Sequence, residues 1–186
     1  TLTHYKHFLF GSESSKDAYN YVDLKVFFTT LATAVVITVL SLCFCYPIAF
    51  YIAKIAEHKT ARLLIVSLIV PFWINELLRA FALRILFAGE GVINNALINA
   101  GLMDNAINFI GQDVALFTGL TYAYLLLMMF PLYNSLESLD TNQLEAAKDL
   151  GSSTLRTHWR IVIPHAKAGI ASGSTMVFML TAGALA

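Results

Sequence analysis

Charged residues are scarce in this sequence, and their scarcity argues against an ordinary soluble domain. Asp, Glu, Lys and Arg together make up 13% of the residues, whereas 58% are hydrophobic. Soluble domains carry about a quarter of their residues as charges. The 12 basic and 12 acidic residues also balance to a net charge of zero. A nucleic-acid partner held by a basic surface is therefore not expected.

The residue sets that metal, cofactor or ATP sites need are also lacking. The two cysteines, Cys43 and Cys45, are two positions apart in an apolar run, so on a helix they point to different faces and neither a disulfide nor a shared metal is expected. His4 and His7 have no third ligand and no helical i, i+4 spacing. The chain has no Gly-x-x-x-x-Gly-Lys-Ser/Thr phosphate loop. We therefore predict no metal, no cofactor and no ATP site of that kind.

Long apolar runs are present instead, and they predict a polytopic transmembrane helix bundle of the all-α class. A helix needs about 20 mostly apolar residues to cross the hydrocarbon core of a bilayer. Residues 30–50 offer only scattered Thr, Ser and Tyr, so they lack the polar stripe of a helix in a soluble bundle. The fourth run is short for a span and reaches the last residue in mid-pattern, so we expect residues 1–186 to be an internal, incomplete piece of a larger membrane domain. The four predicted spans are residues 26–53, 61–88, 114–136 and 168–186.

The basic residues predict how these spans are oriented. Residues 54–62 and 138–167 contain all the lysines and arginines of the loops between spans, and residues 89–113 contain none but include Glu90, Asp104 and Asp113. The positive-inside rule therefore places residues 54–62 and 138–167 in the cytoplasm and residues 89–113 outside.

The cytoplasmic loop 138–167 predicts two short helices separated by a glycine. Asp140 and Gln143 suit the start of the first helix, Gly151 suits its end, and Ser152 or Ser153 suits the start of the second. Leu155, Trp159 and Val162 then form an apolar stripe at i, i+4 and i+7, and Pro164 stops the helix or bends it. Such an element inserts into a groove of a partner protein. The residues alone leave an alternative open, because Arg156, Trp159 and Arg160 also suit a helix lying on the membrane.

A sequence signature in this loop favours the docking interpretation. Glu-Ala-Ala is followed after three residues by Gly, and after nine more by Ile-Val-Ile-Pro. This spacing resembles the signature loop of permease subunits in binding-protein-dependent ABC importers, with Ile163 where leucine is usual. The matching residues are Glu145, Ala146, Ala147, Gly151, Ile161 and Pro164. In that family the loop couples the permease to its ATPase.

Further segments resemble the spermidine/putrescine branch of these permeases. They are Pro71-Phe72-Trp73-Ile74-Asn75 followed by Leu78-Arg79, residues 91–102, and residues 132–150 with Pro131 ahead of them. The resemblance implies a multi-pass subunit of the bacterial cytoplasmic (inner) membrane that forms the pathway for a polyamine and is not itself an enzyme. It also implies three kinds of protein partner: a dimer of ATP-binding subunits, a second permease subunit and a periplasmic solute-binding protein. Membrane lipid surrounds the assembly.

Four residues are candidates for contact with the solute. Glu76 lies within the second predicted span, where burying an ionisable side chain costs free energy unless it is paired or functional. We expect it either to pair with Arg79, three positions further along the helix, or to accept an ammonium group of the solute. Trp73, Tyr122 and Tyr124 offer aromatic faces to a cation. Helix packing or a place at the membrane interface is the commoner role of such aromatics.

Two other functions remain open at this point. One is an importer of the same class that carries a different solute, such as an opine-like compound, an amino sugar or an iron chelate. The other is a secondary transporter driven by an ion gradient, which often contains broken helices at mid-membrane. A secondary transporter needs no docking loop for an ATPase, so the signature loop argues against it.

Overall fold

The computed structural model describes the backbone of residues 21–112 and 114–185, and the side chains of these residues except 21–23, 76 and 112. The predictions for His4, His7 and Asp113, and for the Glu76 side chain, lie outside this part of the chain. Every regular element in the described residues is a helix, which confirms the predicted all-α fold. The α-helices are α2 (Tyr21–Phe50), α3 (His58–Ile69), α4 (Glu76–Leu86), α5 (Val92–Asn99), α6 (Val114–Glu137), α7 (Thr141–Asp149), α8 (Thr154–Thr157) and α9 (Ile163–Leu185).

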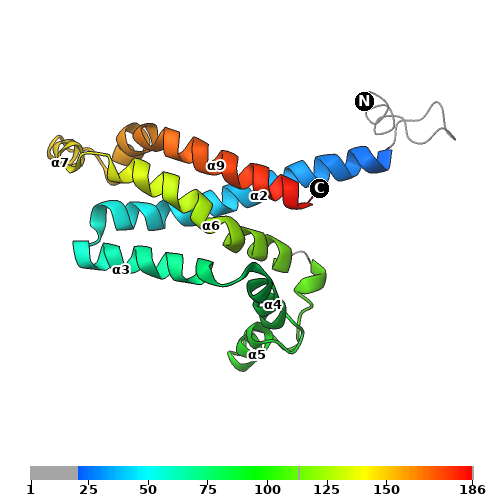
Figure 1. Cartoon of the computed structure of the whole chain (residues 1–186). Coiled ribbons are helices and arrows are strands. Elements are labelled where there is room, and N and C mark those ends of the chain that lie inside the picture. Colours follow the sequence, from blue (N-terminus) through cyan, green and yellow to red (C-terminus); the bar gives the residue numbers. More distant parts are fainter. Residues whose placement is uncertain (1–20, 113, 186) are drawn as a thin grey trace.

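Three long helices form the centre of the molecule. In Figure 1, α2, α6 and α9 lie side by side, and each of them contacts the other two. Their shared interior is aliphatic and sulfur-rich because few polar residues occur in these runs. The largest fully buried apolar side chains in this interior are Ile37, Met128, Leu132, Leu136, Leu139, Val162 and Val177. Many outward-facing apolar side chains of the same helices are exposed, as expected for surfaces that contact lipid.

Helix α9 approaches helix α6 closely at a glycine. A Cβ atom built on Gly169 of α9 would lie 2.5 Å from the Pro131 carbonyl oxygen and 2.6 Å from the Ser135 Cβ of α6. Small residues let helix backbones approach in membranes, where van der Waals contact replaces the hydrophobic effect as the cause of association. Gly169 therefore sets the distance between α6 and α9.

The second predicted span, residues 61–88, is not one straight helix. Within the described residues, three helices are long and apolar enough to cross a membrane, namely Leu24–Ile55, Val114–Glu137 and Thr154–Leu185. The fourth candidate is a pair, His58–Trp73 and Leu77–Leu86, that bends by 98°. Pro71 lies in the 3-10 turn Val70–Trp73, and the Asn75 side chain caps α4 by accepting a hydrogen bond from the Leu77 N–H at 2.9 Å. The chain turns here because proline has no backbone N–H to donate to a helical hydrogen bond and because Asn75 caps the start of a new helix.

The last span also differs from the prediction, because it begins earlier than residue 168. Helix α8, a π-helical turn (His158–Val162) and α9 form one continuous helix, Thr154–Leu185. Pro164 lies inside this helix and does not end it. In the π-helical turn the Ile163 N–H bonds to the His158 carbonyl, so the backbone is already widened just before the proline. π-helical turns are a known way for a helix to change its backbone geometry locally without ending.

The loop at the predicted outer end is organised by one buried amide. Asn94 of α5 is 1% exposed, and its side chain donates to the carbonyls of Ala88 (3.0 Å) and Ile107 (2.9 Å). Its oxygen accepts a hydrogen bond from the Ile107 N–H at 3.0 Å. The Asn94 side chain thus satisfies the hydrogen bonds of three backbone groups, one before α5 and two after it.

Replacing Asn94 by leucine should loosen this outer loop. Each orphaned buried group costs about 1–3 kcal/mol, so we expect lower stability and faster amide hydrogen exchange at Ile107. Asn95→Leu is the matched control, since Asn95 is exposed and its side chain donates a hydrogen bond to the Glu90 carbonyl at 3.0 Å, outside the network of Asn94. Equal exchange at Ile107 in the two variants would contradict the assigned role of Asn94.

Candidate functional site

The sequence signature lies at the end of the molecule opposite α4 and α5, where Figure 1 shows α7 beyond the ends of α6 and α9. Helix α7 begins as the sequence predicts: Asp140 is its N-cap, and its Oδ1 accepts a hydrogen bond from the Asn142 N–H at 2.9 Å. Glu145 and Ala146 are exposed on α7, whereas Ala147 is buried. The helix thus keeps one small residue against the rest of the loop and leaves the carboxylate of Glu145 free for a partner.

The end of α7 is a Schellman motif at Gly151. This residue has φ +75°, which side-chain-bearing residues rarely adopt. The Gly151 N–H donates to the Lys148 carbonyl and the Ser152 N–H donates to the Ala147 carbonyl, both at 2.9 Å. This is the hydrogen-bond pattern of a helix that ends with a left-handed residue. The glycine of the signature therefore fixes the turn between the two short helices.

Ser153 is the N-cap of α8, and its Oγ accepts a hydrogen bond from the Arg156 N–H at 3.4 Å. Of the predicted stripe, Val162 is buried, whereas Leu155 is 71% and Trp159 66% exposed. The stripe therefore does not fold inward as a unit. Leu150, beside the Schellman turn, is 89% exposed. We refer to Leu150, Leu155 and Trp159 as the exposed loop residues; three large apolar side chains without cover in one loop are typical of an interaction surface.

The two remaining signature residues belong to the last long helix. Ile161 packs partly against the buried core of α2, α6 and α9, and Pro164 is exposed. The signature thus begins on α7 and ends on the helix that enters the membrane. This arrangement suits a loop that passes a displacement into a span.

Three polar contacts tie the loop to the neighbouring helices. Lys54, in the π-helical turn after α2, donates from Nζ to the carbonyls of Glu137 (3.1 Å) and Leu139 at the end of α6. The other two contacts are Ser138 Oγ to His165 Nε2 and Tyr46 OH to His158 Nδ1, both 3.0 Å. Each contact joins segments far apart in the sequence, so none of them is visible in a local pattern.

Replacing Lys54 by methionine should uncouple the end of α2 from this loop. Hydrogen bonds from a charged donor contribute about 1.5–3 kcal/mol. Lys54 is only partly buried, so we expect a contribution at the lower end of this range. Lys59→Met is the control, because Lys59 is an exposed lysine of the same predicted cytoplasmic segment. The measurement is the rate of thiol labelling at a cysteine introduced at Ser138, which should rise in K54M alone. Equal rates in the two variants would argue against the tether.

The candidate solute residues are only partly brought together. The Arg79 guanidinium lies over the rings of Phe72 and Tyr122, 5.6 Å from each ring centroid. Tyr124 is two positions from Tyr122, so it points to a different face of α6. Trp73 is 86% exposed in the turn between α3 and α4. Tyr122 therefore already has a cation of the protein at its face, and the three candidates whose side chains the structure describes do not form one compact site.

Sequence reasoning missed the contact of Arg79 with the two rings. It considered Glu76, three positions away on the same helix, as the partner of Arg79. The bend at Pro71 returns Phe72 towards α4, and packing against α6 adds Tyr122. A proline followed by an aromatic residue, with an arginine seven positions on, is the local signal for the first of these contacts.

Comparisons with known proteins identify a family. Residues 47–186 match the model of the "Binding-protein-dependent transport system inner membrane component" family. The chain is 40% identical over 159 residues to the spermidine/putrescine transport system permease protein PotB of Escherichia coli (strain K12), covering 86% of this chain and 58% of that protein. It is 32% identical over 171 residues to PotB of Haemophilus influenzae, covering 92% of this chain and 59% of the relative.

A more distant relative is the inner membrane ABC transporter permease protein YdcU of Escherichia coli (strain K12). The identity is 30% over 176 residues, which cover 89% of this chain and 56% of that protein. The chain therefore spans less than two thirds of the length of these curated relatives. The similarity includes the signature loop and the broken helix pair, because both lie within the matched residues 47–186.

Proposed function

Because this chain belongs to the family of binding-protein-dependent transport system inner membrane components, we propose that it is part of a permease subunit of an ATP-driven importer. In this role its helices help to form the pathway through the inner membrane. The signature from Glu145 to Pro164 receives the motion of a separate ATPase dimer. A second permease subunit and a periplasmic solute-binding protein complete the assembly. The chain itself carries out no catalysis.

The observation that best supports this proposal is the structure of the signature loop. Its start and its turn are fixed by local hydrogen bonds at Asp140 and Gly151, and its end is continuous with a membrane-spanning helix. Its large apolar side chains are nevertheless exposed. A rigid element with an uncovered apolar surface suits a helix-in-groove contact with a soluble partner. A helix lying on the membrane needs no such fixed turn.

For the solute we propose a polyamine such as spermidine or putrescine, on the strength of the relatives that carry that name. Trp73 and Glu76 remain candidates for contact with it. Tyr122 is a weaker candidate than Trp73, because Arg79 already lies at its ring and repels a second cation. A different solute in an importer of the same class is the second candidate, since the relative YdcU is similar over nearly the same residues.

The test is ATP hydrolysis by the full-length complex in lipid vesicles. The complex contains this subunit, its partner permease, the ATPase and the receptor, and the receptor is loaded in turn with spermidine, putrescine and non-polyamine solutes. Stimulation by a loaded polyamine receptor supports both the importer role and the solute. Stimulation only by another solute keeps the importer and rejects the polyamine. A complex that assembles but never responds to any loaded receptor overturns the importer role.

A further inference from the structure

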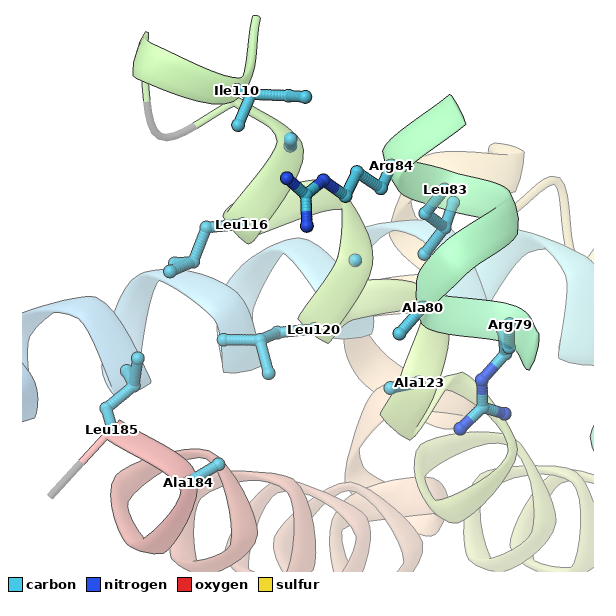
Figure 2. A pocket seen from close by; sticks show the side chains of 12 residues that line it. Arg79, Ala80, Leu83, Arg84, Ile110, Leu116, Leu120, Ala123, Ala184 and Leu185 are labelled. Carbon is cyan, nitrogen blue, oxygen red and sulfur yellow. The ribbon is translucent and has the colours of Figure 1, made fainter. Parts of the chain in front are cut away.

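A cavity of about 370 Å³ opens at the predicted outer end of the molecule, between α4, α6 and the last turn of α9. Figure 2 shows its walls, with Leu83 on α4, Leu116 and Leu120 on α6, and Leu185 on α9. Nearly all of the remaining lining is aliphatic or glycine. This volume falls in the range of small-molecule sites, about 300–1,000 Å³.

Two guanidinium groups lie at this otherwise apolar cavity. Figure 2 shows Arg84 extending from α4 towards the first turns of α6, while Arg79 lies at the other end of α4. Arg79 is engaged with the rings of Phe72 and Tyr122. Arg84 is exposed and forms no hydrogen bond or ion pair with any residue that the structure describes. The lining that the structure describes contains no carboxylate, so no described acidic side chain compensates the two positive charges at the cavity.

The depth of the cavity is given by its wall on α6. That wall runs from Ala115, next to the first residue of the helix, to Ala123. At 1.5 Å per residue this is about 12 Å along the span, so the cavity reaches from the outer interface into the hydrocarbon region. Arginine side chains at this depth turn towards the interface, where lipid phosphates are found.

Each class of occupant can be judged by whether it uses both features of the cavity. A polyamine is repelled by the two arginines. A small soluble anion would pair with them but would gain nothing from the aliphatic walls. A phospholipid uses both, because its phosphate accepts hydrogen bonds from guanidinium groups and its acyl chain contacts the walls.

We propose that this cavity binds an anionic phospholipid of the outer leaflet, with the phosphate at Arg84 and an acyl chain along the wall formed by Leu83, Leu116 and Leu120. The bound lipid fills the space between α4 and the two long helices and holds α4 against them. The site is independent of the transported solute, so it stands or falls separately from the proposed function.

The experiment measures the melting temperature of the full-length chain, purified in detergent and stripped of lipid. Dioctanoyl phosphatidylglycerol should raise it by several degrees, dioctanoyl phosphatidylcholine by less, and inorganic phosphate or dioctanoylglycerol alone not at all. The Arg84→Gln variant should lose most of the rise. The control is the double variant Lys59→Gln, Arg62→Gln, which removes two exposed basic residues at the cytoplasmic side and should keep the full rise.

A second variant keeps the test decisive even where Arg84→Gln does not fold. Leu120→Trp retains both arginines but fills the cavity, so it should also abolish the rise and release one phosphatidylglycerol per chain, as counted by native mass spectrometry. Two results overturn the proposal. One is an equal rise in the wild type and in L120W. The other is the absence of any rise in the wild type, which is expected if the remainder of the chain or a second subunit covers the cavity.

Discussion

Replacing Gly169 by leucine should separate α9 from α6 and unfold much of the helical core. The Cβ alone would lie 2.5 Å from a backbone carbonyl oxygen, so the conflict is with main chain and cannot be relieved by a change of rotamer. Overpacking a well-filled interior costs about 1–3 kcal/mol and occasionally more. We expect about 3 kcal/mol or more here. The measurement is the melting temperature of the purified full-length chain, together with the fraction that elutes as a monodisperse species.

Gly183 on the same helix supplies the matched control for this prediction. It is exposed, and a Cβ atom built on it has nothing within 4 Å. Alanine in a helix interior is favoured over glycine by about 0.8–1 kcal/mol, so Gly183→Ala should be neutral or slightly stabilising. Gly169→Ala should destabilise instead. Effects of the same sign in the two alanine variants would show that helix propensity, and not the approach of α6, governs both positions.

Gly173 should show an intermediate effect. A Cβ atom built there would lie 2.8 Å from the Met128 Sδ, which is a flexible side-chain atom, and 3.2 Å from the Met128 carbonyl oxygen. Methionine adapts its shape more readily than backbone does. The order of melting temperatures for the three alanine variants is therefore Gly183, then Gly173, then Gly169, from highest to lowest.

Replacing Leu150 by aspartate should weaken binding of the ATPase subunit by at least tenfold and leave the melting temperature of this chain unchanged. Leu150 is 89% exposed, so its side chain contributes little to the fold. If it inserts into a groove of the ATPase, a buried charge there removes a contact of the hot-spot kind, worth 2 kcal/mol or more, and about 1.4 kcal/mol is already a tenfold change in affinity. Co-purification and titration of the ATPase with the full-length permease measure this effect.

Leu102→Asp is the control for the docking prediction. Leu102 is 72% exposed, and it lies in the predicted outer segment, which contains no basic residue. The same change of charge and polarity on the predicted outer side of the membrane should leave ATPase binding intact. An L150D variant that binds the ATPase as tightly as L102D would mean that the exposed loop residues are not the docking surface.

The local features of this protein could be read from neighbouring residues in the sequence. The all-α class and the inner membrane followed from long apolar runs and from the signature loop, and the structure and the family match confirm both. The first residue of α7 and the turn at Gly151 followed from short-range hydrogen-bond chemistry. A cap or a left-handed glycine is decided within five or six residues, so it does not depend on the rest of the fold.

Other features were decided only when distant segments packed together. The apolar stripe of Leu155, Trp159 and Val162 was visible in the sequence, but only Val162 is buried, because α2 and α6 meet the helix on that side alone. Residues 61–88 have the composition of a single span, yet the pair of helices bends by 98°. Hydropathy measures how apolar a segment is and contains no information about its direction.

The sequence by itself therefore determined which segments are helical, which of them suit a membrane and which loop carries the family signature, since these depend on composition and on neighbours along the chain. The tertiary structure decided the partners: Arg79 with two aromatic rings, Lys54 with the end of α6, and Gly169 with the backbone at Pro131. The physical reason is that each of these contacts depends on the distance and rotation between helices. Those quantities are set by the close packing of the whole interior, where a shift of one side chain is transmitted to its neighbours.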